Sequence, residues 1–265
     1  MTLIIGIRCS DGVVIGADSA MTYATSFGRA HTIKQKTEKL RLFPEPEARC
    51  IVGCSGAVGL AQRFYRIVGS QGFKQLRGAP EVFCKKVSKE AKDDFMETDA
   101  FRLTTQIPNR LSVNFGALMA FAIGNEFHLC EFEVGSIQPE LKPSGFVTIG
   151  SGQQIADPFL GFLRRVLWPD REPTCSEAVL AVSWTLNHAI TLSPGLVDKP
   201  LRIAELGRNR KGTVRAHILG DDRILEHNDN IESAEKALAN ALFGRAAEAP
   251  IPDMPVATSS RIEEG

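Results

Sequence analysis

The stretch TLIIGIRCSDGVVIGADS, residues 2–19, contains two apolar runs separated by a turn. Residues 2–9 and 12–19 are rich in Ile and Val, and Ser10-Asp11-Gly12 lies between them. Such runs on either side of a short Gly-containing turn predict a β-hairpin. Thr2 directly follows Met1 and begins the first run. Thr is a good β-former, but at an exposed amino terminus it also combines a hydroxyl nucleophile with an amine.

Strand and helix patterns alternate along the rest of the chain. We expect strands at 39–43, 48–54, 112–123, 126–134, 146–149, 201–206 and 212–219, and helices at 57–70, 80–95, 153–167, 175–192 and 230–248. Strands joined by hairpins rather than helical crossovers indicate antiparallel sheets. The sequence therefore predicts an α+β fold, a four-layer αββα sandwich of two antiparallel sheets flanked by helix pairs. We expect one domain at 1–228, followed at 229–265 by a helix and a disordered tail.

The composition excludes several classes of function. The chain has 265 residues, 43% of them hydrophobic and 23% charged, which is typical of a globular protein. Its 31 basic and 31 acidic residues balance, so no global charge attracts nucleic acid or an anionic membrane. No apolar run is long enough to span a membrane, and Asp11 and Asp18 interrupt the run in which a secretory signal would lie. The six cysteines form no CxxC pair, which favours reduced thiols, a cytoplasmic location and no metal or cofactor.

The amino terminus offers a chemical reason for Thr2. Aminopeptidases remove an initiator Met before a small residue, so we expect Met1 to be lost and Thr2 to acquire a free α-amine. The pKa of an α-amine is about 8, compared with about 10.4 for a lysine amine. The amine can therefore be neutral near pH 7 and accept the proton of the hydroxyl on the same residue.

Further motifs follow Thr2 in a fixed order. They are Asp11 to Ser19, Lys39-Leu40, Ile51-Val52-Gly53-Cys54-Ser55-Gly56 and Gly150-Ser151-Gly152. Together, from residue 2 to about 219, they resemble the β-type subunits of the proteasome family, which are amino-terminal-nucleophile hydrolases. Within that family the chain looks most similar to bacterial proteasome homologues and HslV-like peptidases. The resemblance implies that residues 1–228 form the hydrolase domain.

The resemblance also implies a role for individual residues. Thr2 would be the nucleophile, Lys39 a cation beside it, and Asp18 the carboxylate that holds this lysine. The Gly53 N–H would donate to the developing oxyanion, and Ser151 would polarise the amine and a water molecule. Ser193 matches one further serine of the catalytic group. The catalytic residues implied by the resemblance are thus Thr2, Asp18, Lys39, Gly53, Ser151 and Ser193. The residues expected to contact substrate are Met21, Thr22 and Ser55.

Two features depart from the expected pattern. The family often has an Asp three residues before the serine that matches Ser193, but this chain has Ile190 there. A simple two-residue turn at Asp11-Gly12 would also place Asp18 and Thr2 on opposite faces of the hairpin. Their proximity therefore predicts a β-bulge or an altered register.

We expect a threonine-type endopeptidase that assembles into stacked six- or seven-membered rings and cleaves unfolded polypeptides, with an activating ATPase as a further partner. Two alternatives remain open, a small-molecule amidase of the same class and a non-catalytic ring subunit. Each motif also has a structural explanation: Lys39 as a surface charge, Asp18 as a strand-end residue, and Gly53 and Gly150-Ser151-Gly152 as loop or cap residues. Their joint occurrence in order favours the catalytic interpretation.

Overall fold

The computed structural model describes residues 2–22, 34–73, 76–98, 115–133, 140–141, 145–193 and 197–244, and for 21–22, 34–36 and 140–141 it describes only the backbone. The chain divides into two compact units, Met1–Asn228 and Asp229–Gly265. The tail expected from Pro250 onward lies outside the described residues. Among the helices described, none is long and apolar enough to cross a membrane.

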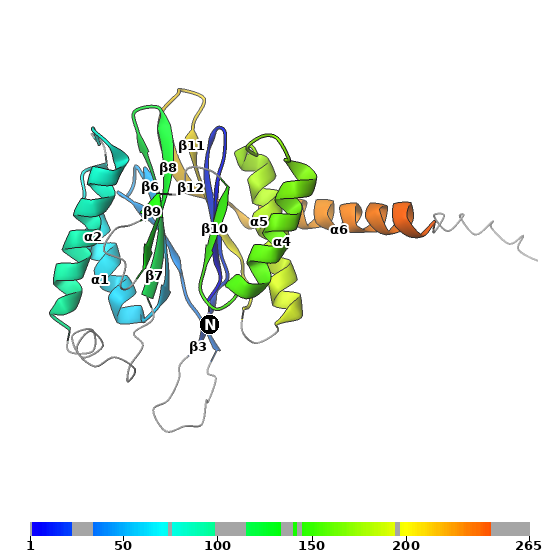
Figure 1. The fold of residues 1–265 in the computed structure, drawn as a ribbon, viewed down its shortest axis with the longest axis horizontal. Helices are drawn as coiled ribbons and strands as arrows, with labels where there is room; N and C mark the ends of the chain where they lie inside the picture. Colours follow the sequence, from blue (N-terminus) through cyan, green and yellow to red (C-terminus); the bar gives the residue numbers. More distant parts are fainter. Residues whose placement is uncertain are drawn as a thin grey trace, which may run out of the picture. The chain divides into compact units, whose positions relative to one another are not determined.

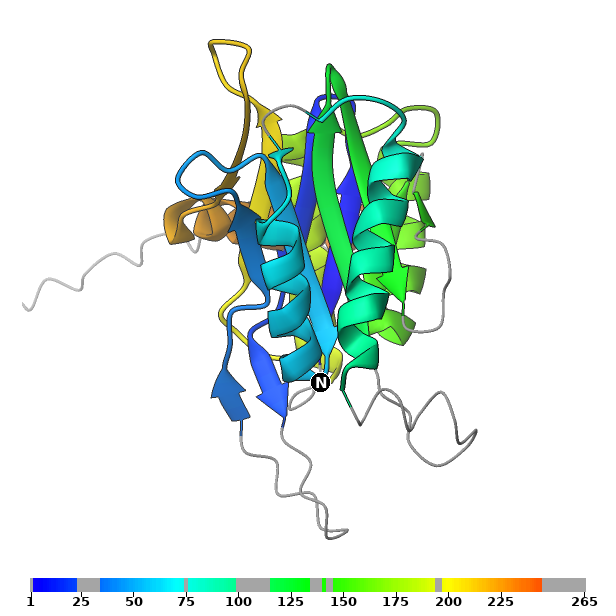
Figure 2. The same ribbon diagram turned by 90° about the vertical axis from the view of Figure 1, so that its left-hand side faces the viewer.

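Two five-stranded antiparallel sheets form the centre of the first unit. The first sheet has the order β10 (Phe146–Ile149), β1 (Ile4–Arg8), β2 (Gly12–Ala17), β11 (Arg202–Arg208) and β12 (Val214–Ile218). The second has the order β5 (Leu40–Phe43), β6 (Cys50–Gly56), β7 (Phe115–Ile123), β8 (Glu126–Glu133) and β9 (Glu140–Leu141). A separate pair, β3 (Ala20–Thr22) and β4 (Lys34–Lys36), lies at the end of the sandwich where the chain begins (Figure 2).

Helix pairs cover the outer faces of the sheets. The second sheet packs against α1 (Val58–Gly69) and α2 (Pro80–Met96), and the first sheet against α4 (Gln153–Leu167) and α5 (Cys175–Leu192) (Figure 1). Three buried apolar clusters fill the three spaces between these four layers. Ile4, Ile15, Ile51 and Leu118 belong to the cluster between the sheets. The structure confirms the predicted αββα sandwich.

The helix ends show why the sequence located most helices closely. At α5, the Thr174 side chain accepts from the Glu177 N–H, and the Glu177 side chain accepts from the Thr174 N–H, which forms a capping box. The observed bounds of α4 and α5 are the predicted ones. The last helix, α6 (Asp221–Phe243), begins at Asp221 rather than at 230. Two acidic residues in its first turn favour this earlier start because they interact well with the positive end of the helix dipole.

Gly16 controls how closely β2 approaches α5. A Cβ atom at this position would collide with Cγ1 of Val182 and would lie 3.3 Å from Cδ1 of Leu186. We therefore expect Gly16→Ala to lower the free energy of unfolding by about 1–3 kcal/mol, as overpacked cores do. Urea unfolding followed by circular dichroism measures the change.

Gly161→Ala is the matched control, because Gly161 lies on an exposed side of α4 with no atom near its missing Cβ. This substitution should raise the stability by about 0.5–1 kcal/mol through helix propensity. Equal effects of the two substitutions would contradict the close approach of β2 and α5.

Candidate active site

A buried ion pair joins the two sheets at one end of the sandwich. Asp18 follows β2 and Lys39 precedes β5, and the Lys39 Nζ lies 2.6 Å from the Asp18 Oδ1. The Lys39 side chain is 5% exposed and that of Asp18 is 0% exposed. Burying two charges is costly unless they are paired and further hydrogen bonds satisfy the remaining atoms.

Backbone donors supply those further bonds. The Leu3 N–H donates to Asp18 Oδ1 at 2.8 Å, while the Ala20 and Asp198 N–H groups donate to Oδ2 at 2.9 and 3.4 Å. Such charge-assisted bonds offset part of the desolvation cost of the carboxylate. Because Leu3 follows Thr2, the oxygen that binds the Lys39 ammonium group is fixed beside the Thr2–Leu3 peptide.

The β1–β2 hairpin achieves this proximity with a regular register. Its pairs run without interruption from Ile4 with Ala17 to Arg8 with Val13, and the Asp18 N–H donates to the Leu3 oxygen at 3.2 Å. The predicted bulge is therefore not present. The turn residues are Ser10 and Asp11 rather than Asp11 and Gly12, and this shifted register still leaves the Asp18 and Thr2 side chains on opposite faces. Asp18 and Leu3 lie opposite each other, and the carboxylate approaches Thr2 through the backbone N–H of Leu3.

The loop after β10 approaches Thr2 from the other side of β1. The Thr2 N–H donates to Ser151 Oγ at 3.2 Å, and the Gly152 N–H donates to the Thr2 oxygen at 3.2 Å. Gly150 has φ +97°, and a Cβ atom there would collide with the Thr2 carbonyl oxygen. A residue without a side chain is therefore needed at 150 to hold Ser151 against Thr2.

Burial lowers the pKa of Lys39. Desolvation is the larger influence, while the charge and hydrogen bond of Asp18 act in the opposite direction. The ammonium group therefore loses its proton more readily than that of an exposed lysine. The backbone of Lys39 is itself held in place, because the Tyr65 hydroxyl on α1 donates to the Lys39 carbonyl oxygen at 2.7 Å.

A cleft of about 100 Å³ lies beside Thr2, between α1 and the strands β5 and β6. Lys39, Arg41, Cys54 and Tyr65 are among the residues that line it. Burial raises the pKa of the Cys54 thiol to about 12. This thiol is therefore protonated near pH 7 and unsuited to act as a competing nucleophile.

The charge of the cleft comes from Arg41. Its guanidinium lies 4.8 Å from the centroid of the Tyr65 ring. Lys39 is paired with Asp18, and Glu38 at the rim is paired with Arg202 at 2.6 Å. Within the part of the chain that the structure describes, no acidic side chain forms an ion pair with Arg41. The cleft beside Thr2 is therefore positively charged.

Gly53 lies in the middle of β6, paired with Leu40 on one side and Leu118 on the other. The next residue, Cys54, donates its N–H to the Lys39 oxygen at 3.1 Å on the β5 side. Because successive N–H groups of a strand point to opposite sides, the Gly53 N–H points towards β7. The structure does not bring it to Thr2, and its oxyanion role stays a prediction.

The other predicted residues are not gathered in the cleft. Ser55 is buried, and its hydroxyl donates to the Gly116 oxygen at 3.4 Å. Ser193 is the C-cap of α5, and its N–H donates to the Ala189 oxygen at 3.0 Å. No described contact joins Ser55 or Ser193 to Thr2. The side chains of Met21 and Thr22 lie outside the described part.

Sequence reasoning missed two residues that support the site. Tyr65 lies within the helix predicted at 57–70, but no role was predicted for it, although a buried tyrosine hydroxyl needs a hydrogen-bond partner. Asp198 accepts from the Ser19 N–H at 3.0 Å and donates its own N–H to Asp18. It acts through its backbone, so its side-chain type carried no signal.

Comparisons with known proteins identify similar folds. No family model matches the chain, and no curated protein matches it. Among solved structures, Anbu (ancestral beta-subunit) from Yersinia bercovieri has a TM-score of 0.65 at 14% identity, covering 93% of this chain and 98% of that one. The Gly-1 mutant of Anbu from Hyphomicrobium sp. strain MC1 has a TM-score of 0.64 at 16% identity, covering 95% and 100%.

A third similar structure describes an assembly. It is titled the helical assembly of the Anbu complex from Pseudomonas aeruginosa and has a TM-score of 0.63 at 17% identity, covering 94% of this chain and 98% of that one. These similarities establish the fold. The assignment given above to the β-type subunits of the proteasome family, with bacterial proteasome homologues and HslV-like peptidases as the most similar members, was wrong. The matched structures are Anbu proteins, a distinct proteasome-like family.

The buried ion pair predicts coupled effects of its two partners. Asp18→Asn leaves the Lys39 amine buried without its counter-charge, and we expect it to lower the free energy of unfolding by about 3–5 kcal/mol. Adding Lys39→Met should recover part of this loss, because it removes the unpaired cation. Urea unfolding of the single and double variants gives the coupling energy.

Asp170→Asn, on an exposed residue, serves as the control for charge loss and should change stability by no more than about 0.5 kcal/mol. Additive effects of Asp18→Asn and Lys39→Met would show that the two groups do not stabilise each other.

Proposed function

We propose that this chain is a subunit of a proteasome-like assembly and cleaves peptide bonds with Thr2 once Met1 has been removed. The proposal rests on contacts from separate parts of the chain that converge on residue 2. The Thr2 N–H is bonded to Ser151, its carbonyl oxygen to Gly152, and the adjacent Leu3 N–H to the buried Asp18–Lys39 pair. These contacts hold Thr2 in a fixed position, and a fixed position is what a reacting group needs.

The bond changes and proton transfers of the proposed reaction take place between Thr2, the substrate and water. The Thr2 hydroxyl oxygen adds to the substrate carbonyl carbon while its proton passes to the α-amine. The carbon–nitrogen bond then breaks, and the amine of the leaving peptide takes that proton. Water hydrolyses the resulting ester with the α-amine again as base, which restores Thr2. The positive charge of protonated Lys39 would favour loss of the hydroxyl proton.

The proposed substrate has an acidic side chain next to the cleaved bond. Arg41 is a charged group of the cleft with no acidic partner among the described residues, and guanidinium groups bind carboxylates in a bidentate manner. The earlier expectation that Met21 and Ser55 line this site favours an apolar side chain. The position of Ser55 gives that expectation no support.

We also propose that the subunit assembles with copies of itself. The similar Pseudomonas aeruginosa complex is a helical assembly, whereas the sequence led us to expect rings of six or seven subunits. Head-to-tail contacts give rings where the rotation between subunits closes and helical filaments where it does not. Both forms are consistent with one repeated interface. An activating ATPase stays a prediction.

A non-catalytic subunit of the same fold is the second candidate. It is favoured by the direction of the Gly53 N–H, which leaves the predicted oxyanion donor aimed at β7. Intact-mass measurement separates the candidates first. Met1 retained on all molecules would leave no Thr2 amine and would support the non-catalytic role.

Replacement of the nucleophile is the direct test. With Met1 removed, Thr2→Ala should reduce hydrolysis of fluorogenic peptides by at least about 10³-fold, because both attack and acyl-enzyme formation need the hydroxyl. Thr2→Ser keeps a hydroxyl and an amine and should retain measurable activity. A peptide β-lactone should add its mass to wild-type Thr2 and not to the Ala variant.

Thr213→Ala, in the β11–β12 turn, should leave the hydrolysis rate unchanged. Undiminished hydrolysis by Thr2→Ala would exclude Thr2 as the nucleophile.

A peptide panel tests the substrate class. We expect peptides with Glu before the cleaved bond to have a kcat/KM about tenfold or more above those with Gln, since hydrogen bonds to charged groups contribute about 1.5–3 kcal/mol. Arg41→Gln should remove this difference. The same ratio in wild type and Arg41→Gln would show that Arg41 does not select the substrate.

A further inference from the structure

A second pocket lies at the opposite end of the sandwich from Thr2. Arg49 immediately precedes β6, whereas Gly56, at the other end of this strand, lines the Thr2 cleft. Six residue-to-residue steps of extended strand lead from Cys50 to Gly56, which corresponds to about 20 Å. The pocket is therefore separate from the candidate active site.

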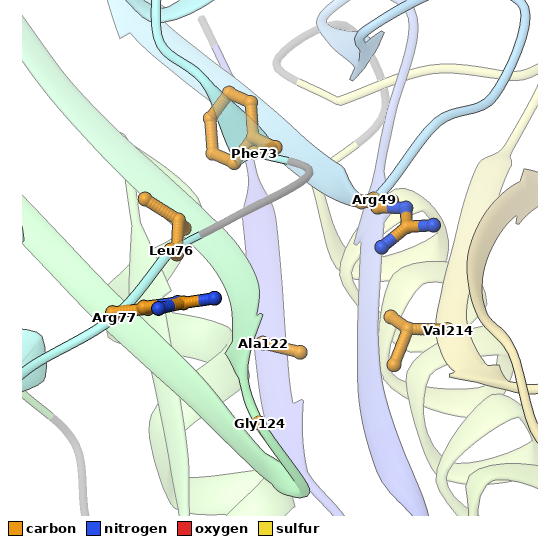
Figure 3. A pocket seen from close by; sticks show the side chains of 7 residues that line it. All are labelled: Arg49, Phe73, Leu76, Arg77, Ala122, Gly124 and Val214. Carbon is orange, nitrogen blue, oxygen red and sulfur yellow. The ribbon is translucent and has the colours of Figure 1, made fainter.

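The pocket has a volume of about 320 Å³ and draws its walls from both sheets. Ala122 and Gly124 come from the end of β7 and the following turn, Val214 from β12, and Leu76 and Arg77 from the connection between α1 and α2. Figure 3 shows Arg49 and Arg77 on different walls of this pocket, with Ala122 between and below them and Val214 below Arg49. The volume lies at the lower end of the range for small-molecule sites.

The two arginines give the pocket an uncompensated positive charge. No acidic residue is among the described residues that line it. In the neighbourhood, Glu47 is paired with Arg215 at 3.2 Å. Arg49 and Arg77 form no ion pair with any acidic side chain in the described ranges. Two guanidinium groups facing one cavity without a counter-charge repel each other, so an anion between them is favoured.

One donor atom of Arg49 lacks a partner within the described part of the chain. The Nε of Arg49 is buried and has no hydrogen-bond partner among the described residues. A buried polar atom left unpaired is unfavourable, and an acceptor placed against it recovers this cost. The guanidinium group presents its N–H donors in a planar fork that matches carboxylate and phosphate oxygens. An oxyanion is therefore the chemical group that satisfies Arg49.

The other described residues of the lining are apolar. Phe73, Leu76, Ala122 and Val214 contribute carbon surface. Phe73 is 4% exposed and packs edge-on against Phe83 of α2, so this wall is fixed by the core. Sites for small organic ligands combine such apolar walls with a few polar groups that fix orientation.

We propose that this pocket binds a small organic anion whose carboxylate or phosphate group lies between Arg49 and Arg77 and whose apolar part contacts Phe73, Leu76 and Val214. Carboxylate and phosphate groups are both oxyanions, so the two ligand types would bind the arginines in the same way. The turn at Gly124 is held by Arg208, which donates to the Gly124 oxygen at 3.2 Å and to Asn125 Oδ1 at 2.8 Å, so this side of the pocket is preformed.

Calorimetric titration of the full chain with benzoate, phenyl phosphate, inorganic phosphate and benzamide tests the proposal. We expect benzoate or phenyl phosphate to bind about tenfold or more tightly than benzamide, because only the anions pair with the guanidinium groups. The stronger of the two anions identifies the ligand type. Inorganic phosphate should bind more weakly than phenyl phosphate, since it lacks the apolar part.

Arg49→Gln should weaken binding of the preferred anion by about tenfold or more. Arg77→Gln, which alters an exposed residue, provides the same test if the Arg49 variant does not fold. Arg210→Gln is the matched control, because it removes one positive charge from the exposed β11–β12 turn outside the pocket. Thr2→Ala should also leave binding unchanged, which separates this site from the proposed hydrolysis.

Three results would overturn the proposal. They are benzamide binding as tightly as the anions, unchanged anion binding in both Arg49→Gln and Arg77→Gln, and no binding of any probe at millimolar concentration. If no probe binds but Arg49→Gln prevents self-assembly, an acidic side chain of another copy occupies the pocket instead of a small molecule.

Discussion

The arrangement at the amino terminus depends on the buried contact between Lys39 and Asp18. Asp18 directly follows β2 of one sheet and Lys39 directly precedes β5 of the other, so their 2.6 Å contact joins the two sheets at this end. The cost of burying the carboxylate is offset by backbone N–H groups from three segments of the chain, each of which is thereby held near Thr2. The same backbone hydrogen bonds therefore compensate the buried charge of Asp18 and position the residues around Thr2.

Much of the fold could be predicted because its determinants are local. The apolar runs on either side of Ser10-Asp11-Gly12 predict the β1–β2 hairpin, and the Thr174–Glu177 capping box locates the start of α5. The start of α6 was placed too late because the Ala-rich part after 230 was the stronger pattern, while the acidic first turn at Asp221 was overlooked. Local sequence signals therefore located the helices and strands well, but some of their ends less well.

The site was predictable only in part, because it depends on contacts between distant residues. Thr2, Asp18, Lys39 and Ser151 are brought together as expected. The predicted bulge was wrong because the Asp18 carboxylate accepts from the backbone N–H of Leu3, which lies directly opposite. Asp18 therefore approaches Thr2 although the two side chains point to opposite faces of the hairpin. The direction of the Gly53 N–H could not be predicted because it depends on the strand register. Gly53 lies in the predicted strand, but its pairing with Leu118 sets the direction of the N–H group.

The balance of effects on Lys39 explains why the pair suits a reacting site. If attraction to Asp18 prevailed, the lysine would hold its proton more strongly than one in water, but burial has the larger influence and lowers its pKa. Low solvent access also strengthens the field that each remaining charge exerts on its neighbours. A cation at Lys39 therefore acts on Thr2 more strongly than the same charge would at the surface. The burial that makes this pair costly to form is thus also what would make it effective beside a nucleophile.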